Sequence, residues 1–242
     1  MTVTTLSIIA FVVLLTGVSK SGFAGALGVF SVPLLMLVMP PVAAIGLMLP
    51  VLIVADVFSL KSYWQQWDIQ QLKRLLPGLL VGVVIAHALI GWLDAAFIKT
   101  AIAILCIVFA IRSLAFSKFT LSALNSRLGA FSMGGLAGIA STLVHAGGPP
   151  LIMYFSTIKL PPKRFVATVA IIFAMMNAVK LIGFISLGLI EIKWALIALA
   201  SLPIAFCGNR LGIWLQGKLN TSQFLKIMNV LLLLLGIWLL VM

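Results

Sequence analysis

The chain has 242 residues, of which 63% are hydrophobic and 8% are charged. A soluble domain carries about 25% charged residues, so this composition excludes a soluble protein and predicts an integral membrane protein. The net charge of +12 is dispersed over short segments between apolar runs; the positive-inside rule and anionic lipid explain such a distribution better than a nucleic-acid partner does.

Ordinary transmembrane helices need roughly 20 apolar residues. The segments that meet this requirement are 42–60, 75–93, 97–115, 165–190, 193–215 and 222–241. Two further apolar regions, 6–39 and 128–158, are too long for one span and too short for two. We expect each of them to form a pair of short antiparallel half-helices or a re-entrant hairpin.

Glycine and proline interrupt both of these regions. The first contains SGFAGALG at 21–28, and the second contains GGLAGIASTLVHAGGPP at 134–150. Glycine loses more backbone entropy than other residues when it is ordered, and proline lacks the N–H donor, so both break helices. Broken backbone at membrane depth is tolerated only inside protein or around a wet cavity. Paired breaks therefore indicate the binding site of a transporter.

The two halves of the sequence resemble each other. GFAG at 22–25 parallels GLAG at 135–138, and PLLM at 33–36 parallels PLIM at 150–153. A further set recurs at identical spacing, with Pro77, Gly82 and Gly91 matching Pro203, Gly208 and Gly217. We interpret this self-similarity as a duplication. It predicts an N-terminal repeat over 1–116, a cytoplasmic linker over 117–127 and a C-terminal repeat over 128–242.

Charge distribution favours an inverted relation between the repeats. Basic residues concentrate in 61–74, 112–127 and 159–164, and all three segments can be cytoplasmic if 128–158 enters the membrane and returns. Each repeat is then a hairpin plus three spans. Because three is an odd number of membrane crossings, the second repeat has the opposite orientation in the membrane. The predicted fold is an all-α polytopic membrane protein of two inverted repeats, with parallel repeats as the alternative.

At these motifs the chain resembles the TauE/SafE family of sulfite and organosulfonate exporters, also called the toluene-sulfonate uptake permease family. The resemblance rests on the segment Gly22 to Leu35 and on GGLAG…GGPPLIMY from Gly134 to Tyr154, and it extends to chain size, central linker and duplication. It implies a multi-pass carrier of the bacterial inner membrane. The implied substrate is a small sulfur-containing or related organic anion, such as sulfite.

Lys20 is the candidate binding residue at the first break. A charge at the bilayer centre costs at least about 3 kcal/mol on insertion scales, and the helix ends around Gly22 and Gly25 would add free N–H donors that suit an anion. The alternative is a lysine that snorkels to the interface.

His145 is the candidate at the second break, beside Gly147 and Gly148. It can donate to an anion or take up a coupling proton, and the alternative is a neutral histidine bonded to loop carbonyls. Asp56 is the second candidate for proton coupling, with an interfacial position near Lys61 as the alternative.

Asn177 and Lys180 lie one helical turn apart within 165–190, and Asp56 occupies the place of Asn177 in the repeat alignment. Lys180 is a site residue or a packing cation. Arg210 can bind an oxyanion through its planar guanidinium, unless it lies at the cytoplasmic end of its span.

Many cations and few acids favour an anionic ligand. The leading hypothesis is a secondary transporter that works by alternating access at a midplane site, and the alternative is an anion channel with a cation-lined pore. No HExxH, GxSxG or Walker A motif is present, which argues against an enzyme or direct use of ATP. We expect no metal or other cofactor. The sequence leaves open the particular anion, the direction of transport, the coupling ion and whether the protein is a homo-oligomer.

Overall fold

The computed structural model describes residues 2–89, 100, 103–104, 106–108, 110–111, 114, 122–186, 188 and 191–241. Every element in these residues is helical. In chain order they are α1 (Val3–Gly22), η1 (Ala26–Phe30), α2 (Ser31–Met36), α3 (Pro41–Ser62), α4 (Ile69–Leu89), η2 (Ser122–Asn125), α6 (Arg127–Val144), α7 (Gly148–Ile158), α8 (Pro162–Ser186), α9 (Ile192–Ala200), α10 (Leu202–Gly217) and α11 (Thr221–Val241). Most of the predicted span 97–115, part of the predicted linker 117–127, and Gly91 of the repeat motif lie outside the described residues.

Several helices are long and apolar enough to cross a membrane. In the described part of the chain they are α1, α3, α4, α8 and α11, with a sixth span if α9 and α10 are counted together. Side chains such as Val57, Val84 and Ile182 are exposed on these helices, as expected for surfaces that face lipid. The all-α polytopic fold is therefore confirmed.

The predicted span 193–215 is bent rather than straight. α9 ends at Ala200, α10 begins at Leu202, and their axes differ by 55°. Pro203 lies in the first turn of α10, where its missing N–H and its ring prevent the helix from continuing from α9.

The two broken regions each consist of one long and one short helical arm. The first pairs α1, of 20 residues, with the short η1 and α2. The second pairs α6, of 18 residues, with α7, of 11 residues. Of the two arrangements expected for the first region, the pair of short half-helices was wrong, because α1 is long and apolar enough to span the bilayer; the re-entrant hairpin stays a prediction.

The described chain divides into two compact units. Unit 1 comprises Met1–Trp67 with Val166–Lys218, and unit 2 comprises Asp68–Phe165 with Leu219–Met242. Each unit therefore combines helices from both halves of the sequence.

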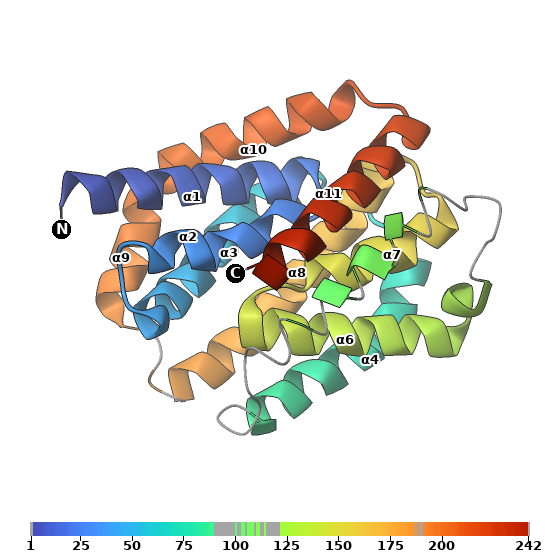
Figure 1. Ribbon diagram of the computed structural model, residues 1–242, viewed down its shortest axis with the longest axis horizontal. Helices are drawn as coiled ribbons and strands as arrows, with labels where there is room; N and C mark the ends of the chain where they lie inside the picture. The colour runs from blue at the N-terminus through green and yellow to red at the C-terminus, as the bar shows by residue number, and fades with distance from the viewer. Residues whose placement is uncertain are drawn as a thin grey trace. The chain divides into compact units, whose positions relative to one another are not determined.

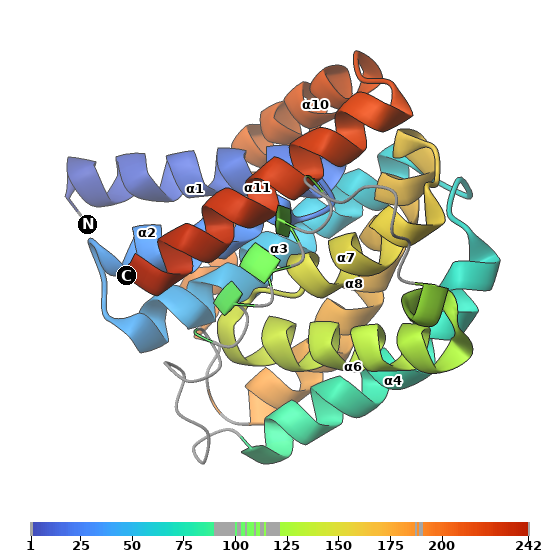
Figure 2. The ribbon, with the colours of Figure 1, turned by 45° about the vertical axis from the view of Figure 1, so that its right-hand side comes forward.

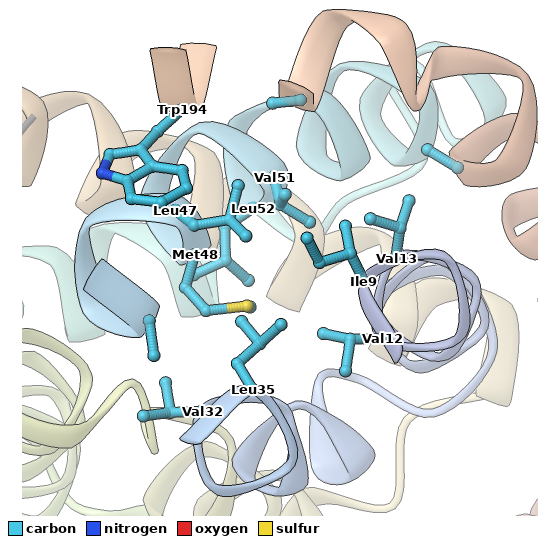
Figure 3. Close-up of a cluster of buried hydrophobic side chains, with 13 residues drawn as sticks. Ile9, Val12, Val13, Val32, Leu35, Leu47, Met48, Val51, Leu52 and Trp194 are labelled. Carbon is cyan, nitrogen blue, oxygen red and sulfur yellow. The ribbon is translucent and has the colours of Figure 1, made fainter. Parts of the chain in front are cut away.

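The core of unit 1 is an apolar cluster between α1, α2, α3 and α9. Figure 3 shows Ile9 and Val12 of α1 turned toward Met48 of α3 and Leu35 of α2. These side chains are at most 3% exposed, and their packing fixes the return arm of the first hairpin against α1 and α3.

Close glycine contacts join one pair of helices in each unit. In unit 1, α1 and α10 run side by side (Figure 1), and a Cβ on Gly22 would lie 2.7 Å from the carbonyl oxygen of Gly212. In unit 2, α4 and α6 run side by side (Figure 2), and a Cβ on Gly82 would lie 2.2 Å from the carbonyl oxygen of Gly135. Small residues allow backbones to approach closely where no hydrophobic effect drives helix association.

We predict that Gly212→Val lowers the melting temperature of the detergent-solubilised protein, because an added Cβ would lie 2.7 Å from the Val18 carbonyl oxygen. Overpacking of this kind costs about 1–3 kcal/mol. The matched control is Gly217→Val on the same helix, where a Cβ would meet nothing within 4 Å. Thermal unfolding followed by tryptophan fluorescence measures both, and equal melting temperatures would contradict the role assigned to this contact.

Candidate functional site

The first hairpin turns at Ala24 and Gly25, directly after α1. The carbonyl oxygen of Ser19 accepts hydrogen bonds from the N–H groups of Phe23 (3.0 Å) and Gly25 (2.9 Å). Gly25 has φ +77°, and a Cβ there would lie 2.5 Å from the ring of Phe173 on α8. The turn therefore requires glycine on both conformational and steric grounds. It ends α1 with Lys20 in its last turn.

Lys20 forms a buried ion pair with Asp56 of α3. The Nζ–Oδ1 distance is 2.5 Å, and each side chain is 4% exposed. Asn177 of α8 donates from Nδ2 to the other carboxylate oxygen at 2.6 Å. Because an ionised carboxylate only accepts hydrogen bonds, this contact fixes the orientation of the Asn177 amide.

Two further side chains of α8, one aromatic and one basic, lie near this ion pair. The ring of Phe173 lies 4.4 Å from Lys20 Nζ, so the ammonium lies between a carboxylate and an aromatic face, as in a cation–π contact. Lys180 is fully buried and interacts electrostatically with both Asp56 and Lys20. We call Lys20, Asp56, Phe173, Asn177 and Lys180 the α1–α3–α8 cluster.

Uncharged polar atoms are buried on the same helices. The hydroxyls of Ser19 and Ser59 and the Oδ1 atom of Asn177 have no hydrogen-bond partner among the described residues. Ser59 lies one turn after Asp56 on α3, and Ser19 lies beside Gly28 of η1. A buried polar group without a partner costs about 1–3 kcal/mol, so these atoms are available to a polar ligand.

Further hydrogen bonds hold the end of α1 against α3 and α10. Tyr63 donates to the Ser21 carbonyl oxygen at 2.6 Å, and burial raises the pKa of Tyr63, which keeps its hydroxyl protonated. The Ser21 hydroxyl donates to the Asn209 carbonyl oxygen at 3.0 Å. These contacts fix the helix turn that carries Lys20.

The second hairpin belongs to unit 2. α6 ends at Val144, and His145 adopts the left-handed conformation with φ 55°, while the N–H of Ala146 bonds to the Ala140 carbonyl oxygen at 3.1 Å. His145 is 8% exposed. Gly147 and Gly148 then lead into α7, whose early prolines suit a helix start.

The structure brings only some of the predicted site residues together. Lys20, Asp56 and Asn177 are in direct contact, and Lys180 lies near them. Gly25 makes the turn beside Phe173, whereas Gly22 packs on Gly212 of α10. The Arg210 side chain is exposed and lies 5.1 Å from the ring of Phe206, so Arg210 is not one of the buried cations.

The sequence analysis missed Ser19, Ser59 and Phe173. The sequence contained a signal for Ser59, namely its spacing. Ser59 lies one helical turn from Asp56, just as Lys180 lies one helical turn from Asn177. The sequence contained no such signal for Phe173, since phenylalanine at helical spacing usually packs in a core or faces lipid.

The cluster combines two lysine side chains, one carboxylate, one amide and nearby hydroxyls in a buried position. No group of three or more His, Cys, Asp or Glu side chains that could hold a metal ion occurs in the described residues.

A comparison with protein-family models shows to which family the chain belongs. The family model described as Sulfite exporter TauE/SafE matches residues 9–239. The chain belongs to the TauE/SafE family. No curated protein and no solved structure gives a significant match.

Membership confirms the resemblance and, together with the apolar helices, an integral multi-pass membrane protein; a bacterial inner membrane is consistent with the family. TauE/SafE proteins are transporters rather than enzymes, and the family implies a sulfite or related sulfur anion as substrate.

We predict that Lys20→Met destabilises the protein by about 3–5 kcal/mol, because it removes the ion-pair partner of the buried Asp56 carboxylate. The double variant Lys20→Met/Asp56→Leu should recover much of this loss. Denaturant unfolding of the two single variants and the double variant measures the coupling.

Arg164→Met provides the control. Arg164 contacts Asp68 at 3.3 Å, but its side chain is 54% exposed, so the loss of this pair should cost no more than about 1 kcal/mol. Additive effects of Lys20→Met and Asp56→Leu would mean that the two side chains do not stabilise each other.

Proposed function

We propose that this TauE/SafE protein is a secondary transporter of small sulfur-containing anions and that it binds them at the α1–α3–α8 cluster. The observation that carries the proposal is a buried pair of lysines, Lys20 and Lys180, that interact with the single carboxylate of Asp56.

The cost of burial supports a functional role for this cluster. Ionisable side chains within membrane-spanning helices are expensive and mark substrate or ion pathways. A lysine ammonium offers three donors, and a serine hydroxyl or an asparagine amide offers further donors. A sulfite or sulfonate group presents several acceptor oxygens, so these donors match its chemistry.

The packing within each unit supports an equivalence of the repeats 1–116 and 128–242. The sequence repeat equates α1 with α6 and α10 with α4. The pairs α1–α10 and α4–α6 are the glycine-joined pairs of the two units. Asp56 and Asn177 are also equivalent and contact each other.

We infer that the repeats are inverted and that transport proceeds by alternating access. The basic segments 61–74 and 159–164 favour inversion under the positive-inside rule. Inverted repeats that surround a broken-helix site are the plan of many secondary transporters. In this proposal Gly22 and Gly25 shape the first hairpin, and His145, Gly147 and Gly148 shape the second.

Flux measurements test this function and separate a carrier from an anion channel. Proteoliposomes that contain the purified protein should take up labelled sulfite or methanesulfonate with saturable kinetics. Preloading with unlabelled substrate should accelerate uptake by counterflow. Uptake that neither saturates nor shows counterflow would favour the channel, and an absence of anion flux would overturn the proposal.

We predict that folded Lys20→Met, identified as the monodisperse fraction in size-exclusion chromatography, shows no such uptake, because the variant lacks the ammonium that contacts the anion. Lys61→Met is the matched control: Lys61 lies on the same helix as Asp56 but is exposed, and its loss should leave uptake close to the wild-type rate. Equal uptake by both variants would remove Lys20 from the site.

We predict that Ser59→Ala weakens anion binding by about tenfold without lowering the melting temperature of the ligand-free protein. A hydrogen bond to a charged group contributes about 1.5–3 kcal/mol, whereas the Ser59 hydroxyl has no partner among the described residues in the ligand-free fold. Ser62→Ala on the same helix is the control, because the Ser62 hydroxyl already bonds to Asn209 at 2.9 Å. Isothermal titration gives the affinities, and a weaker fold with unchanged affinity would show that Ser59 serves packing only.

A further inference from the structure

We propose that Asp56 is a built-in competitor of the substrate anion, so that binding requires protonation of Asp56 and couples uptake of one proton to uptake of one anion. This inference rests on the proposed function of the α1–α3–α8 cluster and assigns its regulation.

The geometry places Asp56 where a substrate oxyanion would go. Its Oδ1 atom lies 2.5 Å from Lys20 Nζ, and its Oδ2 atom accepts from Asn177 at 2.6 Å. A carboxylate with these two contacts already fills an oxyanion position. A second anion at Lys20 would also lie beside a like charge in a buried environment, where water screens the repulsion weakly.

Few other charged groups face this carboxylate. Lys20 approaches it from α1 and Lys180 from α8. η1 and α2 carry no titratable side chain. Arg210 of α10 is exposed, and Lys193 at the start of α9 pairs with Glu191 at an exposed position. In the described part of unit 1, Asp56 is therefore the acid whose neutralisation changes the charge of the cluster.

Protonation removes the competition in one step. A proton from water neutralises the Asp56 carboxylate, the Lys20 ammonium keeps its proton, and its contact passes from Asp56 to the substrate oxyanion. The Asn177 side chain stays beside the neutral carboxyl. Release of the anion lets Asp56 lose the proton and pair with Lys20 again, so that both leave together.

The coupling has a definite sign. The anion-bound state holds one more proton than the free state, so affinity rises as pH falls. With linkage of one proton, the dissociation constant for the anion decreases about tenfold for each unit by which the pH falls. A transporter of this kind accumulates anion on the alkaline side of a pH gradient.

The test uses the full-length protein and methanesulfonate, whose charge stays constant between about pH 5 and pH 8, so that any pH dependence belongs to the protein. Isothermal titration in buffers of different ionisation enthalpy counts the protons taken up on binding. We expect wild type to take up one proton per anion. Binding without proton uptake would overturn the inference and leave the proposed transport function intact, whereas no binding of methanesulfonate or sulfite at any pH would remove both.

Asp56→Asn gives the sharper outcome, because a neutral amide of the same shape imitates protonated Asp56. We expect this variant to bind methanesulfonate at least tenfold more tightly than wild type at about pH 8, with no proton uptake. A loss of binding in folded Asp56→Asn would show that Asp56 is only a structural counter-ion.

Two controls locate the coupling group. Asp68→Asn removes an acid that caps α4, where its Oδ1 accepts from the Gln71 N–H at 3.2 Å, and asparagine caps helices equally well. It should keep the wild-type proton uptake. His145→Ala should keep it too, and a loss of uptake in His145→Ala with retention in Asp56→Asn would assign coupling to His145 and overturn the inference.

Discussion

A charged side chain inside an apolar bundle must find a partner, and the contact between Lys20 and Asp56 meets this requirement. Burial removes both groups from water, which costs several kcal/mol for each ion. The Asn177 amide and the Phe173 ring stabilise the pair further. Together with the Asn177 hydrogen bond, this contact holds the last turn of α1 against α3 and α8.

This arrangement depends in turn on small residues at helix contacts. Gly22 and Gly212 let α1 approach α10 backbone to backbone, and Gly25 lets the chain turn beside Phe173. The glycines of the first motif therefore have different tasks. Some allow close packing, and one permits a left-handed turn; neither task alone creates a binding site. Together they position the last turn of α1, which carries Lys20.

Much of the fold could be predicted from the sequence because the bilayer restricts the solutions. Runs of apolar residues predict the helices α3, α4, α8 and α11, and glycine and proline predict the two breaks. The bend between α9 and α10 was missed, although Pro203 marks it, because the apolar run continues on both sides. Lys20, Asp56 and Asn177 could be named from their cost in lipid, but their contact could not. It depends on the rotation of three helices about their axes, which packing sets.

Each unit draws helices from both halves of the sequence, which limits the order in which the units can form. The α1 surface at Gly22 is covered by α10, from the end of the chain, and the α6 surface at Gly135 is covered by α4, from its beginning. Either half of the sequence alone would leave its glycine surface without the helix that covers it. Because unit 1 combines Met1–Trp67 with Val166–Lys218, its packing can be complete only after the chain has been synthesised as far as Lys218.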